Sequence, residues 1–185
     1  MRIAVDAMGG DYGPGVIVQG VARAVADFSL EVLLVGQREK IEASLAKIPV
    51  NLDARSRIKI VEAPEAIGMG EGPFSFYRKR RSSLQIGAQL VKDGLAQALV
   101  SMGNTAAVVY ISQKIFGPLY GVDKPALALL VPTLQGSTLL IDVGASVNCR
   151  PHHLVQFAFM GKIFMESVMG ISNPRVALMS IGEEE

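Results

Sequence analysis

Three stretches of small and polar residues follow apolar, strand-like runs, and they are the positions best suited to chemistry. The first stretch runs from Asp6 to Asp11 and contains the adjacent glycines Gly9 and Gly10. Adjacent glycines let the backbone approach a ligand closely, and an acid at a strand end can bind a hydroxyl group, a metal or a neighbouring loop. A tight strand-to-helix turn capped by Asp6 explains the same residues, because neither a phosphate-loop lysine nor a dinucleotide glycine fingerprint is present.

The second stretch leads from a short apolar run directly into an apolar, helix-like segment. Its polar and small residues are Ser101, Gly103, Asn104 and Thr105. Hydroxyl, amide and backbone donors at the start of a helix can converge on one anion, so this stretch is a candidate phosphate site. An ordinary N-cap by Asn104 or Thr105 is the alternative.

The third stretch begins at Asp142 and continues through Gly144 and Asn148 to Pro151. Asp142 and Asn148 are candidates for orienting a nucleophile or binding a polar substrate, and Pro151 predicts the first turn of a helix. Ligands of open α/β sheets collect at the carboxyl ends of strands. Because three strand ends carry loops of this kind, their recurrence indicates a binding site more strongly than any single loop.

Cys149, His152 and His153 raise the question of zinc or of a cysteine nucleophile. Adjacent histidines are expected to diverge in regular structure, and no fourth zinc ligand is suitably spaced, so no metal site is predicted. A nucleophilic thiol needs a base beside it in space, which sequence alone does not reveal. Cys149 is therefore expected to be buried or a bystander.

A basic cluster closes the long, glycine-rich connection from Ala63 to Arg81. It consists of Arg78, Lys79, Arg80 and Arg81. The cluster is suited to positioning a phosphate or to docking an acidic partner protein, and the alternative is a solvated start of a helix. A connection this long is usually functional or mobile.

The pattern of elements around these residues predicts an α/β fold: a mostly parallel sheet with helices on both faces, in three α/β/α layers. The strand candidates are Arg2 to Asp6, Leu30 to Val35, Ile58 to Val61, Ala98 to Ser101, Ala126 to Val131, Thr138 to Asp142 and Val176 to Ile181. The helix candidates are Val16 to Asp27, Arg38 to Lys47, Ser82 to Asp93, Thr105 to Phe116 and His153 to Met169. All seven strands are expected to join one sheet in a single domain over residues 1–185. Since three acids follow the last strand without a covering helix, we expect this domain to be the N-terminal portion of a longer chain.

Composition narrows the class of protein. The 185 residues carry 18 Lys and Arg against 17 Asp and Glu, so the net charge of +1 provides no field for nucleic acid. Hydrophobic residues make up 50% of the chain, which excludes disorder. One cysteine and the lack of a secretory signal favour the cytoplasm. Two uncharged stretches, 94–113 and 125–141, are interrupted by polar residues, glycine and proline, so we expect buried strands and helices there rather than membrane spans.

The loops, taken together and in this order, resemble the bacterial phosphate acyltransferase (PlsX) family of phospholipid synthesis. The resemblance covers the whole chain. It rests on Ile3-Ala4-Val5-Asp6-Ala7-Met8-Gly9-Gly10-Asp11, Arg78-Lys79, Ser82-Ser83, Ser101, Gly103-Asn104-Thr105, Asp142-Val143-Gly144-Ala145, Gln156-Phe157-Ala158, Met160-Gly161, Asn173-Pro174-Arg175-Val176 and Ile181-Gly182-Glu183-Glu184-Glu185.

The resemblance implies transfer of a long-chain fatty acyl group from acyl carrier protein to inorganic phosphate, giving acyl phosphate, with no cofactor. It implies a fold similar to isocitrate dehydrogenases and phosphotransacetylases, a homodimer, and peripheral association with the cytoplasmic face of the membrane. Family chains are about twice this length. A short-chain phosphotransacetylase that uses coenzyme A and a non-catalytic phosphate- or nucleotide-binding module are the alternative functions.

The resemblance also assigns roles to residues. It places Asp6, Asn104 and Asp142 in the catalytic group, with both aspartates ordering the strand-end loops. It implies substrate or phosphate binding by Gly9, Gly10, Asp11, Arg78, Lys79, Ser101, Gly103, Thr105, Gly144 and Asn148, and docking of the carrier by Arg80 and Arg81. The sequence departs from the family pattern at Gly70, Gly72, Ala106, Ser146 and Asn148, which affects the details of substrate positioning.

Overall fold

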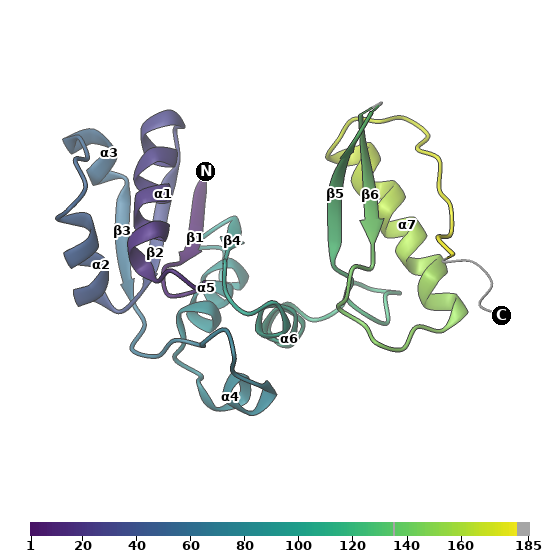
Figure 1. Cartoon of the computed structure of the whole chain (residues 1–185), viewed down its shortest axis with the longest axis horizontal. Coiled ribbons are helices and arrows are strands. Elements are labelled where there is room, and N and C mark those ends of the chain that lie inside the picture. The colour runs from purple at the N-terminus through teal and green to yellow at the C-terminus, as the bar shows by residue number, and fades with distance from the viewer. Residues whose placement is uncertain (135, 181–185) are drawn as a thin grey trace. The chain divides into compact units, whose positions relative to one another are not determined.

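The computed structural model describes residues 1–134 and 136–180 and divides the chain into two compact units (Figure 1). Unit 1 spans Met1–Gly117, and unit 2 spans Pro118–Glu185. That residues 1–185 form one domain stays a prediction.

Unit 1 is built on a four-stranded parallel sheet in the order β3-β2-β1-β4. The strands are β1 (Arg2–Asp6), β2 (Glu31–Gly36), β3 (Ile58–Glu62) and β4 (Ala98–Val100). Ile3 of β1 lies opposite Val32 of β2 on one side and Ala98 of β4 on the other. Runs of Val, Ile and Leu form such strands because a parallel sheet with both faces covered buries successive side chains on both faces. The predicted parallel sheet is confirmed by these strands.

Helices cover both faces of this sheet (Figure 1). They are α1 (Pro14–Asp27), α2 (Arg38–Leu45), α3 (Leu52–Ser56), α4 (Pro73–Arg78), α5 (Ser83–Lys92) and α6 (Thr105–Phe116). Adjacent strand residues point to opposite faces. Leu34 therefore packs with Val18 of α1 and Ile41 of α2, while Leu33 belongs to the core that contains Leu90 of α5. The predicted three-layer α/β/α architecture is confirmed in this unit.

The connection over residues 63–81 contains a helix that the sequence did not predict. Helix α4 begins with Pro73, whose missing N–H costs nothing in the first helical turn. Its Phe76 is 1% exposed and packs in a core with Leu84 of α5 and Ile111 of α6. The connection is therefore anchored at its C-terminal half by an aromatic side chain. Helix α3 was not predicted either.

Unit 2 contains a hairpin and one long helix. Strands β5 (Ala128–Thr133) and β6 (Gly136–Ile141) pair antiparallel, with Ala128 opposite Ile141. Helix α7 (Pro151–Ser167) packs against β6, since a Cβ added at Gly161 would lie 3.5 Å from the Ile141 side chain. The hairpin and α7 thus bury part of their apolar surface on each other.

The prediction of seven strands in one sheet is wrong for the described residues. The segments predicted at 126–131 and 138–142 form the separate hairpin, because the short link between them allows antiparallel pairing, whereas parallel pairing needs a crossover of a dozen residues or more. Residues 176–180 have no regular secondary structure, and Ile181 lies outside the described residues.

The two uncharged stretches form strands and helices, as predicted. The first contains β4 and most of α6, and the second contains β5 and β6. The prediction that these strands and helices are buried is wrong for part of the second stretch, because Leu129 of β5 is 51% exposed in unit 2. Across 1–134 and 136–180, no helix has both the length and the apolar character needed to cross a membrane.

Candidate functional site

Asp6 ties together the two strand-end loops of unit 1. It ends β1, is 3% exposed, and accepts a hydrogen bond at Oδ1 from the Met8 N–H (3.0 Å). Its Oδ2 accepts from the Ser101 hydroxyl just beyond β4 at 2.8 Å, and the Ser101 Oγ in turn accepts from the Gly103 N–H at 3.1 Å. Because β1 and β4 are neighbours in the sheet, one carboxylate bridges both loops. Asp6 therefore links the two loops through hydrogen bonds, and its place in the catalytic group stays a prediction.

Gly9 and Gly103 bring the two loops into backbone contact. A Cβ added at Gly9 would lie 2.7 Å from the Gly103 nitrogen and 2.8 Å from Asp6 Oδ2. Real Cβ atoms do not make such contacts, so the loops approach this closely because position 9 lacks a side chain. Gly10 has φ +92°, a conformation that favours glycine.

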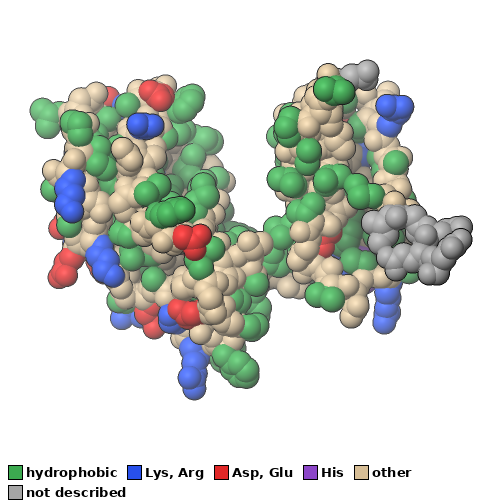
Figure 2. Space-filling model, in the orientation of Figure 1, with side chains coloured by type: hydrophobic (Ala, Val, Ile, Leu, Met, Phe, Trp, Pro, Cys, Tyr) green, Lys and Arg blue, Asp and Glu red, His purple; other side chains and the backbone are tan. Residues whose placement is uncertain are grey.

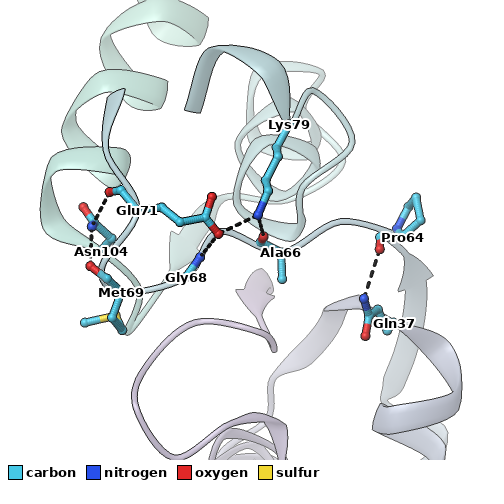
Figure 3. Close-up of polar contacts among 8 residues, drawn as sticks. All are labelled: Gln37, Pro64, Ala66, Gly68, Met69, Glu71, Lys79 and Asn104. Carbon is cyan, nitrogen blue, oxygen red and sulfur yellow. Dashed lines mark hydrogen bonds and ion pairs between the residues drawn. The ribbon is translucent and has the colours of Figure 1, made fainter. Parts of the chain in front are cut away.

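Asn104 links the start of α6 to the loop before α4 (Figure 3). Its Oδ1 caps the helix by accepting from the Ala107 N–H at 3.0 Å. Its amide nitrogen donates to the carbonyl oxygens of Met69 (2.7 Å) and Glu71 (3.2 Å). The alternative of an N-cap is therefore confirmed for Asn104, and both of its amide hydrogens have partners. Thr105, the next residue, is exposed in the first turn of α6.

Glu71, which the sequence did not single out, pairs with Lys79 across the same loop (Figure 3). The Lys79 Nζ lies 2.5 Å from Glu71 Oε1 and donates to the Ala66 carbonyl at 2.7 Å. Glu71 Oε1 also accepts from the Gly68 N–H at 2.8 Å. The hydrogen bond from Lys79, followed by that from Gly68, lowers the pKa of Glu71 from 4.5 to about 2. Lys79 therefore holds the loop in this structure, and its contact with phosphate stays a prediction.

The Glu71 carboxylate predicts a pH-dependent part of stability. Its pKa is depressed in the folded chain, so the unfolded chain binds the proton more readily, and the stabilisation is complete above about pH 4.5 and lost as pH falls towards about 2. Glu71→Gln is expected to lower the free energy of unfolding by about 1 kcal/mol at neutral pH, because the pair is partly exposed. Urea unfolding across this pH range should show the difference from wild type shrinking towards zero.

A matched control for Glu71→Gln is Glu39→Gln. Glu39 is exposed at the start of α2, and the salt bridges found among the described residues do not include it. Glu39→Gln should therefore change the free energy of unfolding only slightly at every pH in this range. A Glu71→Gln deficit that is the same at pH 2 and pH 7 would contradict the role given to the carboxylate.

The rest of the basic cluster faces solvent. Arg78, Arg80 and Arg81 are exposed, and no acidic side chain in residues 1–134 or 136–180 forms an ion pair with them. The Arg80 guanidinium lies 5.4 Å from the centre of the Tyr77 ring. The cluster thus has an inward member, Lys79, and outward arginines that are available to an acidic partner.

In unit 2, the Asp142 carboxylate accepts hydrogen bonds from a strand-end loop, as the Asp6 carboxylate does in unit 1. Its Oδ1 accepts from the backbone N–H groups of Leu127, Gly144 and Ala145, and its Oδ2 accepts from that of Ser146, at 2.8 to 3.2 Å. Burial raises the pKa of Asp142, but these four N–H groups together outweigh burial and lower it. Asp142 is therefore an anion that fixes its own loop.

Asn148 lies further along the same loop. Its side chain is exposed, and its backbone carbonyl accepts from the Lys124 ammonium at 2.7 Å. The roles predicted for Asn148 and Gly144 in binding substrate stay predictions.

His152 and His153 do not diverge, so that expectation is wrong. Their ring centres lie 4.0 Å apart, and with Asp123 they form a group whose ligand atoms lie within 4.8 Å of one another. The reason is a capping box: His153 Nδ1 accepts from the Arg150 N–H at 3.0 Å, which turns its ring back towards the start of α7. Burial, followed by the neighbouring His152, lowers the pKa of His153. Because Nδ1 accepts a hydrogen bond, neutral His153 carries its proton on Nε2 and is a poor metal ligand.

The structure brings the predicted residues of unit 1 into one cluster. Asp6, Gly9, Ser101, Gly103 and Asn104 meet at the carboxyl ends of β1 and β4, beside the first turn of α6. The free N–H groups of a helix start attract anions, whereas the Asp6 carboxylate is occupied by protein donors. This cluster is thus suited to holding an anion on backbone donors while Asp6 keeps the loops in place.

Comparison with known proteins identifies the family of the chain. Residues 1–185 match the family described as "Fatty acid synthesis protein". A phosphate acyltransferase of Heliobacterium modesticaldum is 50% identical over 186 aligned positions, which cover 100% of this chain and 55% of that protein. Phosphate acyltransferases of Desulfitobacterium hafniense and Aquifex aeolicus are 47% and 44% identical, each covering 54% of the relative and 100% of this chain.

The chain spans about half the length of the curated relatives it matches. The aligned positions cover the whole chain and so include both units. A match of this extent does not arise from a shared α/β architecture alone, and the chain therefore belongs to the fatty acid synthesis protein family.

Proposed function

We propose that the protein transfers a long-chain fatty acyl group from acyl carrier protein to inorganic phosphate and releases acyl phosphate. The observation that most supports this is the 50% identity to a phosphate acyltransferase across the whole chain. The cluster at the ends of β1 and β4 supports it independently, because it places a helix N-terminus and glycine loops where an anion can bind.

In this reaction an oxygen of phosphate attacks the carbonyl carbon of the thioester. The new carbon–oxygen bond forms as the carbon–sulfur bond breaks, and the thiol of the carrier leaves with the electron pair and takes up a proton. Phosphate is already an anion at neutral pH, so the protein's main tasks are to hold it against the thioester and to stabilise the oxyanion with backbone donors.

We assign phosphate to the backbone donors at the start of α6 and to the Thr105 hydroxyl, with Asn104 as a positioning residue. A phosphate that bound the Asn104 amide would have to displace the carbonyls of Met69 and Glu71. Holding that loop against α6 lets Asn104 act on the phosphate site without touching phosphate.

The outward arginines, Arg80 and Arg81, are proposed to dock the carrier. With a net charge of only +1, the protein must concentrate positive charge locally to attract an acidic partner. A homodimer and peripheral association with the membrane are further parts of the proposal that rest on the resemblance. A cytoplasmic location is also proposed, and the single cysteine supports it.

The test is turnover by the purified full-length protein. Acyl phosphate should form from a long-chain acyl carrier protein and phosphate, and acetyl coenzyme A should be a poor donor. Preference for acetyl coenzyme A would favour a short-chain phosphotransacetylase instead. Phosphate binding without turnover of either donor would favour the non-catalytic module.

The same assay tests the docking of the carrier. The double charge reversal Arg80→Glu/Arg81→Glu should lower the rate at limiting carrier severalfold at low salt, with the loss shrinking as salt rises and with phosphate dependence unchanged. Arg23→Glu, a charge reversal at an exposed arginine of α1, is the control and should have little effect. Equal losses from both substitutions would contradict docking at Arg80 and Arg81.

A further inference from the structure

Unit 1 contains a cavity of about 570 Å³ between α1 and the β1–β4 side of the sheet. Apolar residues of the strands, Ile3, Val5, Val32 and Val100, form one wall, and α1 forms the other. Figure 2 shows hydrophobic side chains gathered on this face of unit 1, over α1 and the strands beside it. The volume lies in the range of small-molecule sites, which are mostly apolar with a few polar groups.

The polar groups of this cavity lie at one end. Asp6, Gly9, Gly10 and Asp11 line it where β1 ends, next to the proposed phosphate site. Leu30 lines it towards the amino-terminal end of β2. The cavity is therefore an open apolar groove that runs from the glycine loops along α1, with Val16 and Met102 on its exposed side.

The α1 residues that line the cavity are three and four apart and form a stripe beside the buried face of the helix, where Val16 and Gly20 are exposed. Val16, Ile17, Gly20, Val21 and Ala24 belong to it, a distance of about 12 Å along the helix axis. A Cβ added at Gly20 would have no atom within 4 Å, so the missing side chain leaves room in the cavity.

We propose that this cavity holds the hydrocarbon chain of the acyl substrate, with the thioester carbonyl at the end near Gly9 and Gly10. This rests on the proposed function for the identity of the head group. Charge supports it: no lysine or arginine lines the cavity, so the lining offers no counter-charge to a carboxylate head, whereas a neutral thioester needs none. An elongated apolar space beside the reacting groups fits a linear chain better than a polar ligand.

The experiment measures binding without turnover, so its outcome does not depend on whether the protein catalyses the transfer. The probes are neutral acyl thioesters of N-acetylcysteamine, from butanoyl to decanoyl, titrated by calorimetry into the full-length protein. Each added methylene should tighten binding by about fourfold until the cavity is filled. Affinity that does not change with chain length would overturn the proposal.

Gly20→Leu fills the cavity from α1 and replaces a poor helix former by a good one, so the helix itself is not weakened. It should weaken binding of the longest thioester at least tenfold and leave the shortest unchanged. The control is Ala26→Leu, at an exposed position of α1 that does not line the cavity, and it should change neither. Equal effects of both substitutions would overturn the proposal.

Polypeptide is the rival occupant of this cavity, either from a second copy of the chain or from another part of the full-length protein. In that case Gly20→Leu would alter the oligomeric state or lower the melting temperature, and chain-length dependence would stay as in wild type. Size-exclusion chromatography with light scattering and a thermal melt of the same samples detect this outcome, which would also overturn the proposal.

Discussion

Replacing Gly9 by alanine is expected to lower the free energy of unfolding by about 1–3 kcal/mol and to abolish most of the acyl transfer. The added methyl group would lie 2.7 Å from the Gly103 nitrogen and 2.8 Å from Asp6 Oδ2, which are backbone and a buried carboxylate rather than the end of a flexible side chain. The two strand-end loops must then separate. Urea unfolding and initial rates of the same variant measure both effects.

The matched control for Gly9→Ala is Gly15→Ala in the first turn of α1. A Cβ added at Gly15 would have no atom within 4 Å, and the φ angle of Gly15 is not positive. Alanine at this position should therefore be neutral or stabilise the fold by up to about 1 kcal/mol. If Gly9→Ala were as stable and active as Gly15→Ala, the close approach of the loops would not matter for folding or for the site.

The sequence was a good guide to the four strands and to helices α1, α2, α5 and α6 of unit 1, because each of these has a local signature. Short apolar runs rich in Val, Ile and Leu mark β1 to β4. The predicted helix 105–116 coincides with α6, whose start is set by the Asn104 cap and whose end is set by Gly117 at φ +75°. Helix α3 was missed because its five residues are too few to show a helical period.

Pairing was harder to predict than strand formation. Periodicity shows that residues 126–131 and 138–142 are extended, but it does not name the partner of each strand. The short connection between them was the available signal for a hairpin, since parallel neighbours need a long crossover. A similar limit applies to Asp6 and Ser101, which are 95 residues apart in sequence and meet only because β4 lies beside β1.

Two features of the sites depend on side-chain orientation that sequence does not specify. Glu71 had one weak signal, an acid eight residues before Lys79 within a glycine-rich loop, and its carboxylate turns Lys79 inward. His153 turns towards the Arg150 N–H as a capping residue, which brings its ring against that of His152. In both cases a local hydrogen bond decides where a charged or ligating group points.

The link between Asp6 and Ser101 yields the second large effect. Asp6→Ala removes the acceptor of the Met8 N–H and of the Ser101 hydroxyl in a site where Asp6 is only 3% exposed. Leaving buried donors without partners costs about 1–3 kcal/mol each, so the free energy of unfolding should fall by several kcal/mol. Asp11→Ala, at an exposed acid in the same loop, should change it by less than about 0.5 kcal/mol.

A double-mutant cycle separates the link from general damage to the loop. Ser101→Ala should cost less than Asp6→Ala, because Asp6 keeps its bond from Met8 while Gly103 loses the acceptor for its N–H. Once Asp6 is alanine, the Ser101 hydroxyl has lost its acceptor, so removing it costs only the acceptor of the Gly103 N–H and should destabilise less than it does in wild type. The double mutant should therefore be destabilised by about 1 kcal/mol or more less than the sum of the two single effects, measured by urea unfolding of all four proteins. Strict additivity would mean that the carboxylate and the hydroxyl stabilise their loops separately, and that β1 and β4 are not joined through this hydrogen bond.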